Sequence, residues 1–202
     1  MDVIRVLLVE DHPVVLRGLR TLTAEHAEFE VVGEATSASQ ALDAAARLRP
    51  DVVVLPVRLG GAHSGIELCR SIKTVCDARV VVFTSFTRQI DVQIARLAGA
   101  DALVSKTAPD DAFIAALRQV RVGPHALVME AGQASWVEAR RFAPVEPLTE
   151  RENEILHLMM EGLTNPDMAA RLTIEVSTVK THVRSILRKL GVDNRKDLFR
   201  GV

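Results

Sequence analysis

The chain has 202 residues, enough for one medium-sized domain followed by a small one. Apolar residues make up 48% of it but aromatic residues only 3%, so the cores must be built mainly from aliphatic side chains. The net charge of −1 excludes a general polycation, so any surface for nucleic acid must be local. Because there is no long apolar run and no basic leader, we expect a cytoplasmic protein without a membrane partner.

Five short, valine-rich runs alternate with helical patterns over residues 1–121. Nearly continuous apolar runs are typical of strands that are buried on both faces. Five strand–helix repeats therefore predict an α/β domain with a doubly wound, five-stranded parallel sheet. The expected strands are residues 3–9, 29–35, 51–55, 79–84 and 100–104, and the expected helices are residues 13–26, 37–48, 64–76, 88–98 and 109–120.

The alternation ends after residue 121. Residues 122–146 start close to Gly123-Pro124 and contain further prolines near their end, which predicts a linker. Within it, residues 126–141 could form one helix. Every segment of residues 147–202 has a helical pattern, so we expect a small all-α domain there.

Polar side chains stand at the ends of the predicted strands. Glu10 and Asp11 follow the first strand, Thr84 ends the fourth and Lys106 follows the fifth. Doubly wound sheets place their functional groups at the carboxyl ends of the strands. The two acids could bind a hard cation such as magnesium and the lysine could pair with an anion, or all of these could be ordinary solvated groups. The residues alone leave both interpretations open.

Residues 1–121 resemble the receiver domain of two-component response regulators of the NarL/FixJ type. Residues 4–13 are similar to the family's first strand and acidic pair, and residues 49–55 to the lead into its phosphorylation site. Thr84 and Lys106 match the family's hydroxyl residue and lysine. The resemblance implies a receiver-like, flavodoxin-like fold in a bacterial regulator that is not an enzyme and needs no cofactor.

Position 56 departs from that family, which has the phosphoaccepting aspartate there. Pro56 has no carboxylate to accept phosphate or to bind a metal. Leu103 also replaces the family's usual aromatic residue, and Gly60 replaces a usual proline. We expect no metal beyond weak magnesium binding at the acidic pair, which Lys106 is expected to neutralise. The degenerate phosphorylation pocket would comprise Glu10, Asp11, Pro56, Thr84, Leu103 and Lys106.

The C-terminal pattern predicts a helix-turn-helix. Thr149 and Glu152 have the spacing of a capping box, and Asn165 is the expected cap of the next helix. A turn over residues 173–176 leads into a longer helix, residues 177–190. That helix has an apolar stripe, and its other face carries Lys180, Thr181, Arg184 and Arg188. With Lys189, residues 176–190 contain four basic residues and no acids, a local excess suited to a polyanion.

Residues 148–195 resemble the LuxR-type helix-turn-helix, notably in residues 148–152, 162–165, 178–183 and 187–192. The resemblance implies that Lys180, Thr181 and Arg184 face base edges in the major groove, with Thr178, His182 and Arg188 as candidates for phosphate contacts. Glu175 stands where the family often has a capping serine, so the cap is expected to be weaker. Residues 194–202 should form a short helix, which in the family makes a dimer contact.

Our first hypothesis is therefore a sequence-specific transcription regulator that binds promoter sites on double-stranded DNA. It would act without phosphorylation at position 56 and receive its input through dimerisation, a small-molecule ligand or a partner. We expect a homodimer, or else a heterodimer with a paralogue. The alternatives are a modulator that heterodimerises with a paralogous regulator and a phosphorelay receiver with a different acceptor.

Overall fold

The structure is a computed structural model of the whole chain. It describes residues 3–60, 64–85, 89–122, 128–130, 133–134, 146 and 148–198. The chain divides into two compact units, Met1–Phe142 and Ala143–Val202, and each is treated by itself. Among the described residues, no helix is long and apolar enough to cross a membrane.

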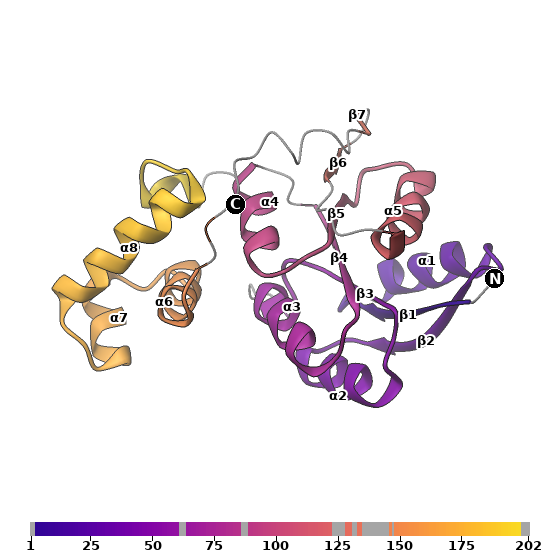
Figure 1. Cartoon of the computed structure of the whole chain (residues 1–202), viewed down its shortest axis with the longest axis horizontal. Helices are drawn as coiled ribbons and strands as arrows, with labels where there is room; N and C mark the ends of the chain where they lie inside the picture. The colour runs from indigo at the N-terminus through magenta and orange to yellow at the C-terminus, as the bar shows by residue number, and fades with distance from the viewer. Residues whose placement is uncertain are drawn as a thin grey trace. The chain divides into compact units, whose positions relative to one another are not determined.

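The first unit contains a parallel sheet with helices on both faces (Figure 1). Four of the five strands are buried along most of their length, as their continuous apolar runs require, whereas residues 29–35 at the sheet edge are mostly half-buried or exposed. The predicted five-stranded parallel sheet is thus confirmed. Its strands lie in the order β2 (Phe29–Ala35), β1 (Ile4–Val9), β3 (Val52–Leu55), β4 (Arg79–Thr84) and β5 (Ala102–Ser105).

Helices α1 (Pro13–Ala24) and α5 (Asp110–Val122) cover one face of the sheet, and the other three helices of this unit cover the opposite face (Figure 1). Consecutive strand residues point to opposite faces. Accordingly, Val6 and Leu8 pack with Phe113 of α5, while Leu7 between them is buried on the other side. The opposite face carries α2 (Ala38–Leu48), α3 (Ser64–Val75) and α4 (Gln89–Leu97).

Two short strands extend the sheet beyond β5. β6 (Val128–Glu130) pairs in parallel with β5, and β7 (Gln133–Ala134) pairs antiparallel with β6. Their pairing satisfies backbone groups along the otherwise open edge of β5, which a helix would leave unpaired. The helix that the sequence allowed over residues 126–141 is therefore wrong for the described part of that segment.

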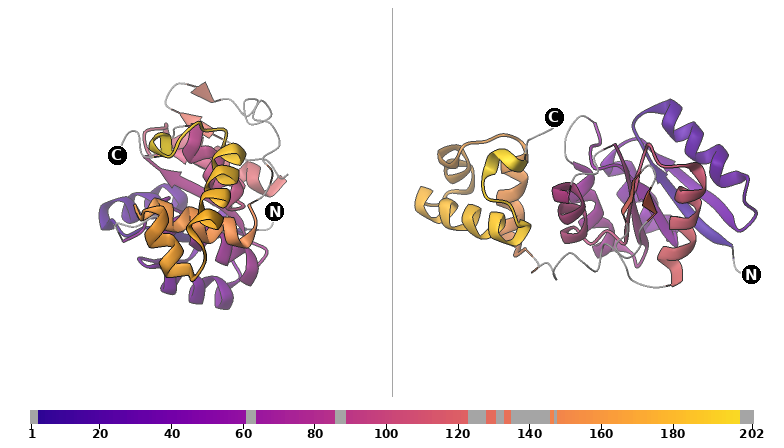
Figure 2. Two further views of the ribbon diagram at one scale, coloured as in Figure 1. Left: turned by 90° about the vertical axis from the view of Figure 1, so that its left-hand side faces the viewer. Right: turned by 90° about the horizontal axis from the view of Figure 1, so that it is seen from above.

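The second unit is helical. Helices α6 (Glu150–Met160), α7 (Asn165–Leu172) and α8 (Val176–Leu190) pack against one another (Figure 2). The predicted small helix-turn-helix domain is confirmed. The short helix expected at the C-terminal end is present as the 3₁₀ helix η2 (Arg195–Leu198), and residues 199–202 lie outside the described part of the chain.

The helix starts in this unit differ in one detail from the sequence expectation. Thr164, not Asn165, caps α7: its Oγ1 accepts the N–H of Asp167, whose carboxylate accepts the N–H of Thr164. This reciprocal pair satisfies two backbone groups that a cap at Asn165 would not. α8 begins after Glu175, which makes no side-chain cap hydrogen bond, so the weaker cap expected there is confirmed.

Candidate functional site

The acid at the end of β1 is already bound by groups of the chain. Glu10 is 1% exposed, and its Oε2 accepts a hydrogen bond from Lys106 Nζ at 2.5 Å. Its Oε1 accepts the backbone N–H of His12 at 3.1 Å and lies 2.8 Å from His12 Nδ1. The ammonium group of Lys106 also lies 5.8 Å from the centre of the Phe83 ring. A buried carboxylate is stable here because a cation and an N–H both satisfy it.

The neighbouring acid is held in a similar way. Asp11 Oδ2 accepts the backbone N–H of Gly60 at 2.8 Å, and Oδ1 lies 3.1 Å from His12 Nδ1. Burial raises the pKa of the Asp11 carboxyl, but the Gly60 hydrogen bond and nearby His12 outweigh that effect and lower it. The hydrogen bond to Glu10, together with Asp11, raises the pKa of His12. A cation would have to compete with these contacts.

Glu10, Asp11 and His12 could in principle share a metal ion, since their ligand atoms lie within 4.8 Å of one another. The set fits a magnesium ion poorly. Magnesium takes oxygen ligands in octahedral geometry, whereas Glu10 is paired with Lys106 and Pro56 contributes no carboxylate. Glu10, Asp11 and Pro56 therefore give a magnesium ion too few free oxygen ligands.

Pro56 is buried directly after β3. Its carbonyl faces the start of α3 so closely that a Cβ on Gly65 would lie 1.8 Å from the carbonyl oxygen. Thr84 at the end of β4 is 2% exposed, and its carbonyl accepts the N–H of Lys106 at 2.8 Å. Leu103 is also buried, but within β5 rather than at its carboxyl end, opposite Val82.

The second candidate surface is one face of α8. Val179, Ile186 and Leu190 are buried, and Val183 and Leu187 on the same stripe are half-buried. All six side chains that the sequence singled out for DNA contact lie on this helix. Five of them are exposed, namely Thr178, Lys180, Thr181, Arg184 and Arg188, and His182 is half-buried.

Lys189 does not belong to this face, although the sequence counted it among the basic residues. Its side chain is only 5% exposed, and Nζ lies 2.8 Å from Glu152 Oε2 and 3.4 Å from Glu146 Oε1. Arg188 remains largely exposed and pairs with Glu146 at 3.1 Å. Three of the four basic residues of α8 are therefore exposed on its basic face, and Lys189 is not.

Comparison with known proteins identifies both units. The response regulator receiver domain matches residues 6–118, and the bacterial regulatory proteins of the luxR family match residues 146–202. The chain belongs to the LuxR-type response regulators. It is thus a DNA-binding transcription regulator of the kind found in two-component systems.

Individual relatives agree with this assignment over nearly the whole chain. The regulator is 39% identical to the DNA-binding transcriptional activator DevR/DosR of Mycobacterium tuberculosis, covering 95% of this chain and 90% of that one. It is 32% identical to the nitrate/nitrite response regulator NarL of Escherichia coli, covering 94% and 90%. The crystal structure of response regulator ChrA, from a heme-sensing two-component system, is similar with a TM-score of 0.53 and 34% identity, covering 98% and 95%.

A buried polar network links α6 to α8 in the regulator. Besides its capping role, the Glu152 carboxylate accepts hydrogen bonds from Ser185 Oγ at 2.6 Å and from Lys189 Nζ at 2.8 Å. Burial raises the pKa of Glu152, but the bonds from Lys189, Ser185 and Thr149 outweigh it and hold the pKa at about 2. The sequence revealed the capping box but not this link, because the partners are 33 and 37 residues away.

Proposed function

We propose that this regulator binds specific promoter sequences without phosphorylation at the position that receivers of its type use. The observation that carries the proposal is Pro56, a buried proline directly after β3. A carboxylate oxygen is the nucleophile that forms an aspartyl phosphate. Proline has no such oxygen, so this position supplies no acceptor.

The surrounding contacts support the same conclusion. An added phosphoryl group needs a cation beside it, and a receiver pocket must therefore have free acidic ligands for magnesium. Here Lys106 is bound to Glu10, and the N–H of Gly60 is bound to Asp11. Asp51 precedes β3 and so lies at the opposite end of that strand from Pro56. We propose that the acidic pair serves as a structural ion pair with Lys106.

For DNA, we propose that Lys180, Thr181 and Arg184 read base edges in the major groove. Their exposure on α8, opposite the buried stripe of that helix, supports this role. Arginine and lysine are the usual partners of guanine edges, and threonine contacts either hydrogen-bonding groups or the thymine methyl group. We assign Thr178, His182 and Arg188 to the flanking phosphates, which position the helix without reading sequence.

We further propose that the regulator binds as a homodimer, because helix-turn-helix proteins commonly read two half-sites. A heterodimer with a paralogue is the alternative, in which this chain modulates a second regulator. A homodimer predicts that the purified chain alone protects both halves of a paired site in footprinting. Protection that needs an added paralogue would favour the modulator.

The absence of an acceptor is tested by chemical phosphorylation. We expect that ³²P-labelled acetyl phosphate with magnesium leaves the regulator unlabelled, because Pro56 offers no carboxylate. Pro56→Asp should gain label, although incompletely, because Lys106 and Gly60 compete for the acidic pair. Pro56→Asn is the matched control, since asparagine has nearly the same shape as aspartate but lacks the carboxylate that would accept phosphate. Label on both the unaltered chain and the Pro56→Asn variant would instead establish a different acceptor.

A further inference from the structure

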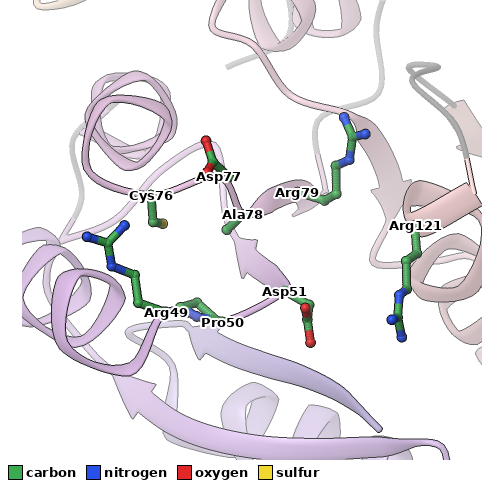
Figure 3. A pocket seen from close by; sticks show the side chains of 8 residues that line it. All are labelled: Arg49, Pro50, Asp51, Cys76, Asp77, Ala78, Arg79 and Arg121. Carbon is green, nitrogen blue, oxygen red and sulfur yellow. The ribbon is translucent and has the colours of Figure 1, made fainter. Parts of the chain in front are cut away.

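A hollow lies at the other end of the sheet, where β3 and β4 begin (Figure 3). Its volume is about 340 Å³. Arg49 lines it from the end of α2, Arg79 from the start of β4 and Arg121 from the last turn of α5 (Figure 3). Asp51 and Asp77 also line it. None of these residues belongs to the degenerate phosphorylation pocket.

The backbone at Arg49 is strained. It has φ 46° and ψ 61°, the left-handed conformation in which helices usually end on glycine. An arginine side chain is disfavoured there, so the fold holds Arg49 in this conformation at some cost in free energy. Arg5 fixes the surrounding rim: its Nη1 donates to the Arg49 carbonyl at 3.0 Å, and its N–H donates to Asp51 Oδ2 at 2.8 Å.

Arg79 is held in place by a buried acid. Its Nη1 donates to Asp101 Oδ1 at 2.9 Å, and Asp101 Oδ2 accepts the N–H of Val80 at 2.7 Å and Lys73 Nζ at 2.5 Å. The Arg79 side chain nevertheless remains 37% exposed. A guanidinium has five N–H donors, so one bond to Asp101 leaves others available to a ligand. The ion pair therefore orients Arg79 without using up its donors.

We propose that this hollow binds a small molecule through an oxyanion group, either a phosphate or a carboxylate. Three arginines against two aspartates give the lining residues a net charge of +1. The planar fork of arginine matches both oxyanions. Asp77 can accept a hydrogen bond from a hydroxyl or an amine elsewhere on the ligand. The volume lies near the lower end of the usual range for small-molecule sites, roughly 300–1,000 Å³.

Binding at this hollow stands independently of how the regulator is activated. That the bound molecule acts as the regulator's input rests on the proposed function. Anion binding at the hollow and phosphorylation independence can be disproved separately. The first is measured by titrating the protein with an anion, and the second by its labelling with ³²P-acetyl phosphate.

The test is an NMR titration of the ¹⁵N-labelled full chain with inorganic phosphate and, separately, with succinate, at constant ionic strength set by chloride. We expect saturable shifts at the amides of Asp51, Ala78 and Arg79 with at least one of the two anions. Saturation with phosphate alone assigns a phosphorylated ligand, and saturation with succinate alone a carboxylate. The Arg49→Gly variant should bind the anion about tenfold more weakly, because it loses one charge-assisted contact.

Two variants separate binding from folding. Arg49→Gly relieves the left-handed strain, so its thermal denaturation midpoint should rise while its affinity falls. Arg47→Gln removes a neighbouring exposed arginine of α2 that does not line the hollow, and should leave affinity unchanged. Shifts that rise linearly with both anions, or an equal loss of affinity in the Arg47→Gln variant, would overturn the proposal.

Discussion

Replacing Glu152 with alanine should lower the free energy of unfolding of the helix-turn-helix unit by about 3 kcal/mol. The substitution removes the capping box of α6 and the bonds to Ser185 and Lys189. It also removes the nearer of two acidic groups that contact Lys189, whose side chain is only 5% exposed and whose Nζ lies 3.4 Å from Glu146 Oε1. A charge that loses its partner when buried costs far more than a lost surface contact.

Hydrogen exchange in the full chain measures this effect separately from the receiver-like unit. Amides of α6 and α8 should exchange roughly 150-fold faster in the variant, which corresponds to about 3 kcal/mol. Glu154→Ala is the matched control: Glu154 lies one half-turn away and pairs with Arg151 at 2.7 Å, but its side chain is 55% exposed. An exposed pair contributes under about 1 kcal/mol. Equal effects of the two substitutions would contradict a central role for Glu152.

Replacing Arg184 with alanine should weaken binding to the specific operator by roughly five- to 150-fold, the equivalent of 1–3 kcal/mol for a lost base contact. Because a base contact carries sequence information, affinity for unrelated DNA should fall much less. The same pattern is expected for Lys180→Ala. Fluorescence anisotropy with operator and scrambled duplexes at several salt concentrations measures both affinities.

Arg188→Ala provides the contrast on the same helix. If Arg188 contacts a phosphate, its loss should weaken binding to both duplexes alike and reduce the salt dependence by about one unit of slope. The ion pair with Glu146 is largely exposed, so its loss should disturb the fold little. Indistinguishable behaviour of the Arg184 and Arg188 variants would refute the division of α8 into base-reading and phosphate-binding residues.

The fold could be predicted where long patterns repeat. The apolar runs identified all five parallel strands, because four of them are covered on both faces and are therefore apolar along most of their length. Strands β6 and β7 could not be predicted, since two- or three-residue strands are too short to show a period and form by pairing with an existing edge. The left-handed backbone of Arg49 could not be predicted either, because arginine is not a residue type that favours that conformation.

The positions of the site residues could be predicted where the order of strands and helices determines them, but not where they depend on contacts between helices. Glu10 and Lys106 stand at strand ends, and strand topology alone brings such positions together. Lys189 could not be placed from the sequence, because it lies on the edge between the apolar stripe and the basic face of α8. Its position depends on Glu152 of another helix, and spacing within one helix gives no information about that partner. The cap of α7 was predicted one residue too late, at Asn165, although Thr164 and Asp167 have the three-residue spacing of a capping box.

We propose, from Pro56 and the exposed face of α8, that this response regulator reads DNA without an aspartyl phosphate. Its receiver-like unit retains a packed core, Glu10 pairs with Lys106 and Asp11 accepts the N–H of Gly60, so the unit is a folded domain without a carboxylate at position 56. In such a regulator the input must reach DNA binding by another route, for which the hollow at the opposite end of the sheet is our candidate.

The most direct measurement is the affinity of the purified, never-phosphorylated chain for its genomic operator, before and after incubation with acetyl phosphate and magnesium. We predict specific binding in the untreated protein and an unchanged affinity after treatment, whereas the Pro56→Asp variant should respond at least partly. Specific binding by the unaltered chain that appears only after phosphodonor treatment would contradict the account.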